Sequence, residues 1–308
     1  MIAWSLPRMK LNERPIARLK QINHILNPQR GFSSVKQGSK YSPNFKQYLK
    51  LPNGETGSFF HDVPMDLNLK DRTAQMIVEV PRWSNGKFEI SKDLEYNPIV
   101  QDMKKGKVRF VHNIFPYCGY IHNYGAIPQT WEDPTENSRN GGLESLAGDN
   151  DPLDCCEIGS SILQTGDIKT VRILGSLALI DDGELDWKII AINVEDPISS
   201  QLQNLNDVNK YLPGILEATR EWFRDYKIPD GKPSNSFAFN GQYKDVADTI
   251  EIIQDCHDSW KKLVSGSKEN EDFKGLPQIK RAGADFAVKA DEQPAQPIPK
   301  DIHKWWYI

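Results

Sequence analysis

The segment GDNDPLD, residues 148–154, is the part of the chain best suited to chemistry. Its three carboxylates, Asp149, Asp151 and Asp154, fall within six residues that include no basic side chain. Like charges this close repel each other unless a positive charge lies among them. Oxygen ligands at this density, without His or Cys, favour Mg²⁺ or Mn²⁺ over zinc. The segment therefore predicts a divalent metal site that serves phosphate chemistry.

A second acidic run and a set of basic and phenolic residues extend this prediction. The run DDGELDWK contains Asp181, Asp182, Glu184 and Asp186 and ends at Lys188. Phosphate chemistry needs donors that neutralise the charge shifting to the leaving oxygens. Candidate donors lie on or beside predicted elements; they are Lys87, Arg109, Lys188, Tyr226 and Lys227. Together with metal ions they would form a clamp for a small, highly anionic molecule.

Two familiar kinds of site do not fit these residues. The sequence has neither GxxxxGK followed by Ser or Thr nor GxGxxG, so the usual Gly-rich phosphate loops are missing. An EF-hand loop starting at Asp149 would need Gly at position six and Glu at position twelve, where the chain has Asp154 and Ser160. A solvent-exposed, Asp-rich turn without any ligand remains the alternative to a metal site.

Strand patterns dominate the region that must position these residues. Residues 73–80 and 87–90 alternate in polarity and predict strands with polar chemistry on one side of a sheet. Two apolar runs, residues 171–180 and 187–194, are joined by the acidic DDGELD turn, which predicts a hairpin. Because side chains alternate along a strand, Asp186 and Lys188 should lie on the same face.

Helical patterns follow the strands. Asp207 is predicted to cap a helix over residues 208–225 that buries a stripe running from Tyr211 to Phe223. A second helix is predicted over residues 245–264, with His257 as a packed residue of its inner stripe. Many strands followed by two helices favour a mainly β (α+β) fold, a barrel or curled sheet with helices packed outside and a polar mouth. A doubly wound βαβ fold would require helices between the strands.

Composition sets wider limits. The chain has 308 residues, of which 38% are hydrophobic and 26% charged, so it can bury a substantial core. No apolar run approaches the roughly 18–20 residues of a membrane span, so no span is expected. The formal net charge of −4 offers no general attraction for nucleic acid.

The first 32 residues differ from the rest of the chain. They contain a single acid, Glu13, against six basic residues, Arg8, Lys10, Arg14, Arg18, Lys20 and Arg30. This composition is typical of a mitochondrial transit peptide, with a solvated basic arm or an RNA-binding tail as the alternatives. Cleavage is expected after Phe32, which leaves one catalytic domain over residues 33–308 with an extended, Pro-containing tail from about residue 284.

Seven motifs together resemble family I soluble inorganic pyrophosphatases. They are FHDVP, VEVPRW, KKGKVRF, GYIHNYGAIPQTWEDP, GDNDPLD, DDGELDWK and EWFRDYKIPDGKP, in the order of the family over most of the chain beyond residue 32. The eukaryotic branch is the most similar, and the basic leader resembles the fungal mitochondrial form. The resemblance implies an OB-like five-stranded β-barrel with flanking helices, and hydrolysis of pyrophosphate to two phosphates by direct attack of a water held between metal ions. It also implies a homodimer in the mitochondrial matrix.

The resemblance further implies roles for single residues. Asp149, Asp154 and Asp186 would hold the tightly bound metal, and Asp154 would also serve a second one. Asp181 and Asp186, with Glu89, would hold metals that arrive with substrate, and Glu79 would act through water. The metals would be several Mg²⁺ ions, for which Mn²⁺ could substitute. Asp151 would take a proton from the attacking water. The phosphoryl groups would be bound or lined by Lys87, Arg109, Tyr226, Lys227, Lys188, Tyr124 and Tyr120.

Two alternatives remain beside this interpretation. OB-like barrels also bind single-stranded nucleic acid through aromatic platforms, for which Trp83, Tyr117, Tyr120 and Tyr124 are available. The acidic mouth would repel a polyanion in the absence of metals, which argues against that function. A catalytically inactive relative with a structural role is the other alternative, and the complete set of acidic and basic residues argues against it.

Overall fold

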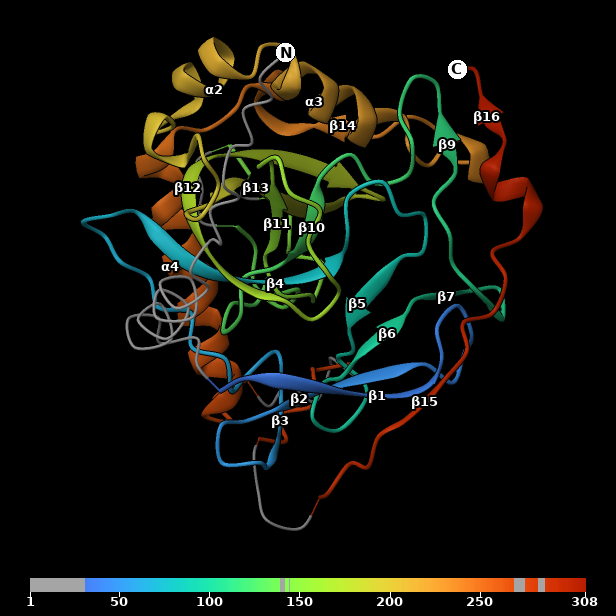
Figure 1. Ribbon diagram of the computed structural model, residues 1–308. Coiled ribbons are helices and arrows are strands. Elements are labelled where there is room, and N and C mark those ends of the chain that lie inside the picture. The colour runs from blue at the N-terminus through green and yellow to red at the C-terminus, as the bar shows by residue number, and fades with distance from the viewer. Residues whose placement is uncertain (1–30, 139–141, 144, 269–274, 282–285) are drawn as a thin grey trace, which may run out of the picture.

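The computed structural model describes residues 31–138, 142–143, 145–268, 275–281 and 286–308. The predicted transit peptide, residues 1–32, therefore lies almost entirely outside the described residues. The described part is mainly β with a few helices, as predicted (Figure 1). None of its helices has the length and apolar character needed to cross a bilayer.

The elements follow one another along the chain in an order that places most strands before the helices. They are β1 (Ser33–Ser39), β2 (Lys46–Lys50), β3 (Thr56–Gly57), β4 (Thr73–Val80), β5 (Phe88–Ile90), β6 (Ile99–Gln101), β7 (Met103–Lys104), β8 (Lys107–Val108), β9 (Asn113–Ile114), β10 (Asn123–Ala126), β11 (Asp154–Glu157), β12 (Ile168–Asp181), β13 (Glu184–Asn193), η1 (Ser199–Gln201), α2 (Leu205–Tyr211), α3 (Ile215–Asp225), η2 (Ile228–Asp230), β14 (Ser236–Phe237), η3 (Ala238–Gly241), α4 (Val246–Val264), β15 (Asp291–Gln293), η4 (Lys300–His303) and β16 (Trp305–Trp306).

One sheet forms the centre of the molecule. Its strand order is β13-β11-β10-β4-β12-β14, and β13 also pairs with β12, so the pairings of five strands return to their starting point. The predicted strand over residues 73–80 is β4, with the same bounds. β4 pairs with β10 along one edge and with β12 along the other. Residues 74–80 are all buried, including Gln75 and Glu79, and its apolar side chains belong to two buried clusters. The polar side chains of β4 therefore lie inside the molecule.

The predicted hairpin is present but longer than expected. β12 and β13 pair antiparallel from Val171–Asn193 to Asp181–Glu184. Asp182 and Gly183 form the turn with φ angles of 50° and 97°, the left-handed values that two-residue hairpins require. Most of the acidic run thus belongs to the strands. Asp186 and Lys188 lie on the same face of β13, as the period-two pattern predicted. The ion pair between their side chains shows this.

The first predicted helix is two helices, so the prediction of one continuous helix was wrong. α2 ends at Tyr211 and α3 begins at Ile215, with Pro213 and Gly214 between them. Pro disfavours helical geometry in the residue before it, and Gly214 adopts a φ of 88°. The cap of α2 is Asn204 rather than Asp207. Tyr211 is exposed, whereas the later part of the predicted stripe, Leu216, Thr219, Trp222 and Phe223, is buried.

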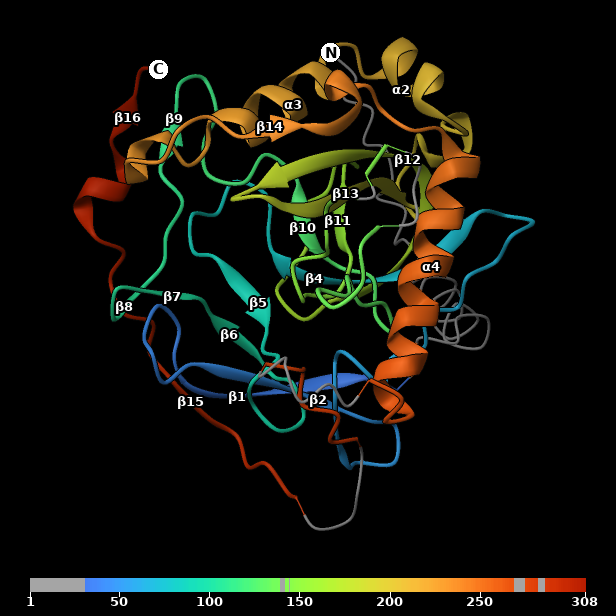
Figure 2. The ribbon, with the colours of Figure 1, turned by 180° about the vertical axis from the view of Figure 1, so that it is seen from behind.

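The second predicted helix is α4, and Asp245 caps it by accepting a hydrogen bond from the backbone of Asp248. α4 runs along the outside of the central sheet (Figure 2). Ile252 and Ile253 belong to a buried cluster that also contains residues of β12 and β13. His257 bonds the carbonyl of Gln129 and stacks on Trp260, the packing role that was predicted for it.

A second sheet, with the order β15-β1-β2-β6-β5, lies beside the first and includes the C-terminal tail (Figure 1). β15 pairs in parallel with β1, and β16 pairs in parallel with β9. β5 is the edge strand of this sheet, and the backbone N–H of Ile90 donates to a carboxylate oxygen of Glu79 on β4 at 2.7 Å. The two sheets therefore meet where β4 and β5 carry predicted site residues.

Candidate active site

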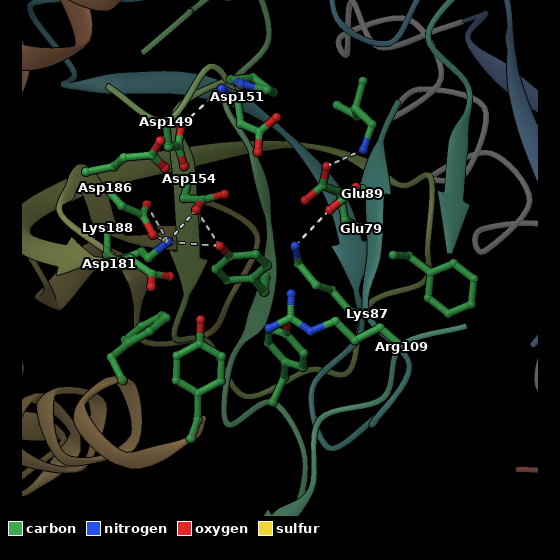
Figure 3. A pocket seen from close by; sticks show the side chains of 18 of the residues that line it. Glu79, Lys87, Glu89, Arg109, Asp149, Asp151, Asp154, Asp181, Asp186 and Lys188 are labelled. Carbon is green, nitrogen blue, oxygen red and sulfur yellow. Dashed lines mark hydrogen bonds and ion pairs between the residues drawn. The ribbon is translucent and has the colours of Figure 1, made fainter. Parts of the chain in front are cut away.

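All of the sequence-predicted site residues line one cavity of about 300 Å³. The acidic loop, β11 and the β12–β13 hairpin form one wall, with Asp149, Asp154, Asp181, Asp186 and Lys188 (Figure 3). β4, β5 and the segment after β8 form the opposite wall, with Glu79, Lys87, Glu89 and Arg109. Tyr226 and Lys227, which follow α3, and Tyr120 and Tyr124, at β10, complete the lining.

Strand register places the centre of the acidic wall. β11 pairs in parallel with β13, with Asp154 opposite Lys188, and Asp186 lies two residues earlier on the same face. The buried ammonium group of Lys188 contacts carboxylate oxygens of both Asp154 and Asp186. It also lies 3.1 Å from the hydroxyl of Tyr124, which donates to Asp154. One cation thus holds two carboxylates side by side.

The loop that carries Asp149 and Asp151 is held by hydrogen bonds on both sides. The indole N–H of Trp131 donates to Asn150 at 3.0 Å, and the amide of Asn150 donates to the carbonyl of Gly275 at 2.8 Å. Asn150 has a φ of 71°, a value that Asn tolerates better than most residues. The backbone N–H of Asp151 donates to Asp149. These contacts leave both carboxylates turned into the cavity (Figure 3).

The opposite wall is a network of alternating charges. Lys87 contacts Glu89 at 2.8 Å and Asp102 at 3.3 Å, and Arg109 contacts the same oxygen of Asp102 at 3.0 Å. Asp102 therefore holds the two cations next to each other. Lys227, farther along the rim, forms an ion pair with Asp181. An anionic ligand in the cavity would meet cations that are already fixed in position.

Burial shifts the proton affinity of the acidic wall. Burial, together with the neighbouring charges of Asp151 and Asp186, raises the pKa of Asp149 well above its ordinary value. Burial and the charge of Asp154 raise the pKa of Asp186 to about 7, although Lys188 opposes the shift. The pKa of Glu79 is raised well above its ordinary value by burial and by the charge of Asp154. Burial and the neighbouring carboxylates together raise these pKa values even though Lys188 and Lys87 lie close by, so a further cation among the carboxylates would stabilise their charged forms.

The donor set suits a hard divalent cation. One oxygen each of Glu132, Asp149 and Asp186 lies within 4.8 Å of the other two. Asp154 lies beside Asp186 through their shared contact with Lys188. All of these donors are carboxylates, and the described residues that line the cavity include no His or Cys. Such oxygen-only sets fit Mg²⁺ or Mn²⁺ better than zinc.

Three residues of the site were not predicted from the sequence. Lys92 lines the cavity and contacts Asp151 at 2.8 Å. Strict alternation from Lys87 and Glu89 would place it on the other face, but β5 ends at Ile90 and the chain turns. Asp102 lies outside the acidic runs and the seven motifs, and only the fold brings it to Lys87 and Arg109. Glu132 lies in the motif GYIHNYGAIPQTWEDP, but no role was predicted for it from the sequence.

Comparisons with known proteins agree with this geometry. A family profile described as inorganic pyrophosphatase matches residues 76–261. A protein of Saccharomyces cerevisiae named "Inorganic pyrophosphatase, mitochondrial" is 59% identical over 298 residues, covering 96% of each chain. An inorganic pyrophosphatase of Candida albicans is 47% identical, covering 90% of this chain and 98% of its own. The solved structure of the inorganic pyrophosphatase of Schistosoma japonicum superimposes with a TM-score of 0.82 at 41% identity, covering 90% of this chain and all of that one.

Proposed function

The chain belongs to the inorganic pyrophosphatase family, and from that premise we propose that it hydrolyses pyrophosphate to two orthophosphates, with Mg²⁺ as its natural cofactor. The observation that carries this proposal is the division of one cavity of about 300 Å³ into a carboxylate wall and a wall of fixed cations. Pyrophosphate needs both walls. Metal ions must lie between its negative oxygens and the carboxylates, and its remaining phosphoryl oxygens need hydrogen-bond donors that carry positive charge.

Carboxylates of both walls are proposed to hold the metal ions. Asp149, Asp154 and Asp186 would hold the tightly bound ion, with Asp154 reaching a second one. Asp181, Asp186 and Glu89 would hold ions that arrive with substrate, and Glu79 would contribute through water. Bound Mg²⁺ supplies Lewis-acid charge and lowers the pKa of a water toward neutrality, so that no strong protein base is needed. Mn²⁺ is expected to substitute.

Asp151 is proposed to accept the proton of the attacking water. Its carboxylate projects into the cavity from the loop that also carries Asp149, and Lys92 holds one of its oxygens at 2.8 Å. The other oxygen stays available for a water between the two walls. Direct attack then requires no covalent intermediate, because the nucleophile, the base and the phosphoryl group meet in one step.

The cationic wall and the phenols are proposed to bind the two phosphoryl groups. Lys87, Arg109, Tyr226 and Lys227 would bind phosphoryl oxygens, Lys188 and Tyr124 would assist, and Tyr120 would line the pocket. Lys87 and Lys227 now contact Glu89 and Asp181, which are proposed metal ligands. When these carboxylates turn to metal ions, their lysines become free to bind phosphate. Binding of metal and substrate would therefore favour each other.

Further features of the protein are part of the proposal. The five-strand ring is proposed to be an OB-like barrel, and residues 33–308 to form one catalytic domain with an extended tail from about residue 284. The low acid content of the leader and the mitochondrial name of the yeast relative support cleavage after Phe32 and function in the mitochondrial matrix. The exposed aromatic residues of the C-terminal end are compatible with a homodimer.

Phosphate release from pyrophosphate tests the proposed reaction. The chain from Ser33 is assayed with Mg²⁺, then with excess chelator, and then with Mg²⁺ restored. We expect activity only in the first and third conditions, with two phosphates formed per pyrophosphate consumed. Activity that persists in chelator would contradict the metal-dependent mechanism. N-terminal sequencing of protein recovered from fractionated cells tests the mitochondrial location and the cleavage site. An uncut chain in the cytosol would refute the location but not the proposed reaction.

A further inference from the structure

We propose that Glu132 is a carboxylate of the metal site, where it holds a divalent cation together with Asp149 and Asp186. The inference rests on the proposed function, because it assigns a further residue to the same site. One oxygen of each of these three side chains lies within 4.8 Å of the other two. Asp149 and Asp186 are neighbours on the acidic wall (Figure 3). Glu132 approaches this pair from a segment that contains neither acidic run.

An oxygen without a partner points to a missing ligand. Glu132 is 4% exposed. Its Oε1 atom accepts a hydrogen bond from the backbone N–H of Trp187 at 3.0 Å, whereas Oε2 has no hydrogen-bond partner among the described residues. Leaving a buried carboxylate oxygen unpaired is costly, because the oxygen loses its hydrogen bonds to water and gains none in the protein. A cation held jointly with Asp149 and Asp186 would give this oxygen the partner it lacks.

The backbone around Glu132 is fixed to the metal-binding loop. Its N–H donates to the carbonyl of Asp151 at 2.9 Å, and its carbonyl accepts from the N–H of Asn150 at 2.9 Å. A Cβ atom at Gly148 would lie 2.4 Å from the carbonyl carbon of Glu132, so the two segments can approach this closely only because residue 148 is Gly. Glu132 therefore joins the loop of Asp149 to the strand of Asp186, because its backbone bonds the loop and its carboxylate accepts from the N–H of Trp187.

The position of Glu132 directs it to the cation and away from the substrate. It does not line the cavity that holds the other site residues; it lines a smaller cavity beside α4, together with Trp187. Oxygens that lie about 2.1 Å from an octahedral Mg²⁺ are about 3.0 Å apart when adjacent and about 4.2 Å apart when opposite. The three separations in the metal-free site, all within 4.8 Å, would have to shorten toward these values when the ion binds.

Mn²⁺ binding to Glu132→Gln tests the assignment. The Gln side chain keeps an oxygen for the N–H of Trp187 but removes the negative charge. We expect the dissociation constant for the tightest Mn²⁺, measured by equilibrium dialysis and electron paramagnetic resonance, to rise about 10- to 100-fold. The melting temperature of the metal-free protein should stay unchanged. The matched control is Glu136→Gln, since Glu136 lies on the same segment but pairs with Lys262 and Lys268, and its Mn²⁺ affinity should equal that of wild type.

A second variant separates the failure of this inference from that of the proposed function. Asp149→Asn should weaken Mn²⁺ binding whether or not Glu132 is a ligand. If it does so while Glu132→Gln binds Mn²⁺ as wild type does, Glu132 has no part in the site; if neither change weakens binding, the whole metal site is misassigned. Should Glu132→Gln fail to fold, Glu132→Asp decides, because a shortened ligand weakens Mn²⁺ binding and an unchanged affinity overturns the assignment.

Discussion

The two ends of β11 place carboxylates in opposite surroundings. Glu157, at one end, is 1% exposed and has both oxygens occupied by protein donors, namely the backbone N–H groups of Gly159 and Asn193 and the side-chain amide of Asn123. Asp154, at the other end, meets Lys188 and Tyr124 beside the acidic wall. We call the Glu157 end of β11 the closed end of the central sheet and the Asp154 end the open end.

The difference shows which charges serve folding and which serve binding. Backbone and amide donors at the closed end cannot be exchanged, so Glu157 acts as a structural hydrogen-bond acceptor. The carboxylates of the open end pair with lysine ammonium groups, and at Glu132 one oxygen has no partner among the described residues. In the proposed mechanism these ammonium groups would turn to phosphate once metal ions replaced them on the carboxylates. Changes at the open end should therefore affect activity, and changes at the closed end should affect stability.

The largest expected effect is at the open end. Asp151→Asn should lower kcat by about 10²- to 10⁴-fold, because the amide keeps the shape of the side chain but cannot accept the proton of water. Binding of Mn²⁺ and pyrophosphate should persist, and dialysis measures it separately from turnover. Asp71→Asn, in an exposed loop, serves as the control. Turnover within a few-fold of wild type would remove Asp151 from the role of base.

The cationic clamp should give the next largest effect. Arg109→Ala and Lys227→Ala should each lower kcat/KM by about 10²- to 10³-fold, since each removes a charge-assisted contact to phosphate. Lys36→Ala is a suitable control because Lys36 pairs with Glu292 at the exposed surface. Steady-state rates over a range of pyrophosphate concentrations measure the effect. Similar small losses in all three variants would mean that the clamp is misassigned.

A substitution at the closed end should lower the stability of the protein and leave its activity unchanged. Glu157→Ala leaves the donors of Gly159, Asn193 and Asn123 without their acceptor, which should lower the free energy of unfolding by about 3 kcal/mol. Urea denaturation of the metal-free protein measures this loss. The folded variant should keep wild-type kcat and Mn²⁺ affinity. A loss of Mn²⁺ binding in folded Glu157→Ala would show that the two ends are not independent.

The smallest expected effect is a pH dependence near the closed end. Burial, followed by the charge of Arg82, lowers the pKa of His122 to about 3, and its Nε2 lies 2.7 Å from the hydroxyl of Thr219. Since the unfolded chain takes up this proton near pH 6.5 and the folded one only near pH 3, stability falls as pH drops between these values. His122→Gln should flatten this fall between pH 6.5 and 4.5 in thermal unfolding. An identical pH profile in both proteins would contradict a neutral, buried His122.

The sequence predicted the elements whose patterns are local. The strand predicted from the alternation in residues 73–80 has the same first and last residues as β4, and Asp245 caps the start of α4, as expected. The break between α2 and α3 was not predicted, because the apolar stripe continues across it. Pro213 and Gly214, which commonly end helices, lie at this break. The motifs predicted the residues of one site, and in the structure all of those residues line one cavity.

What the sequence could not predict depends on tertiary contact. Lys92 reaches Asp151 only because the chain turns after β5, and Asp102 acts by bridging Lys87 and Arg109. Glu132 lies near Asp149 and Asp186 because the backbone of its segment pairs with the acidic loop. None of these contacts has a sequence spacing of its own.

Anomalous diffraction from crystals that contain Mn²⁺ and a non-hydrolysable pyrophosphate analogue tests the central claim most directly. The claim is that the open end is the metal and pyrophosphate site. It predicts Mn²⁺ peaks about 2.1–2.2 Å from oxygens of Asp149, Asp154 and Asp186, and the analogue between those ions and Lys87, Arg109 and Lys227. Metal peaks outside this cavity, or an analogue bound without contact to the ions, would contradict it.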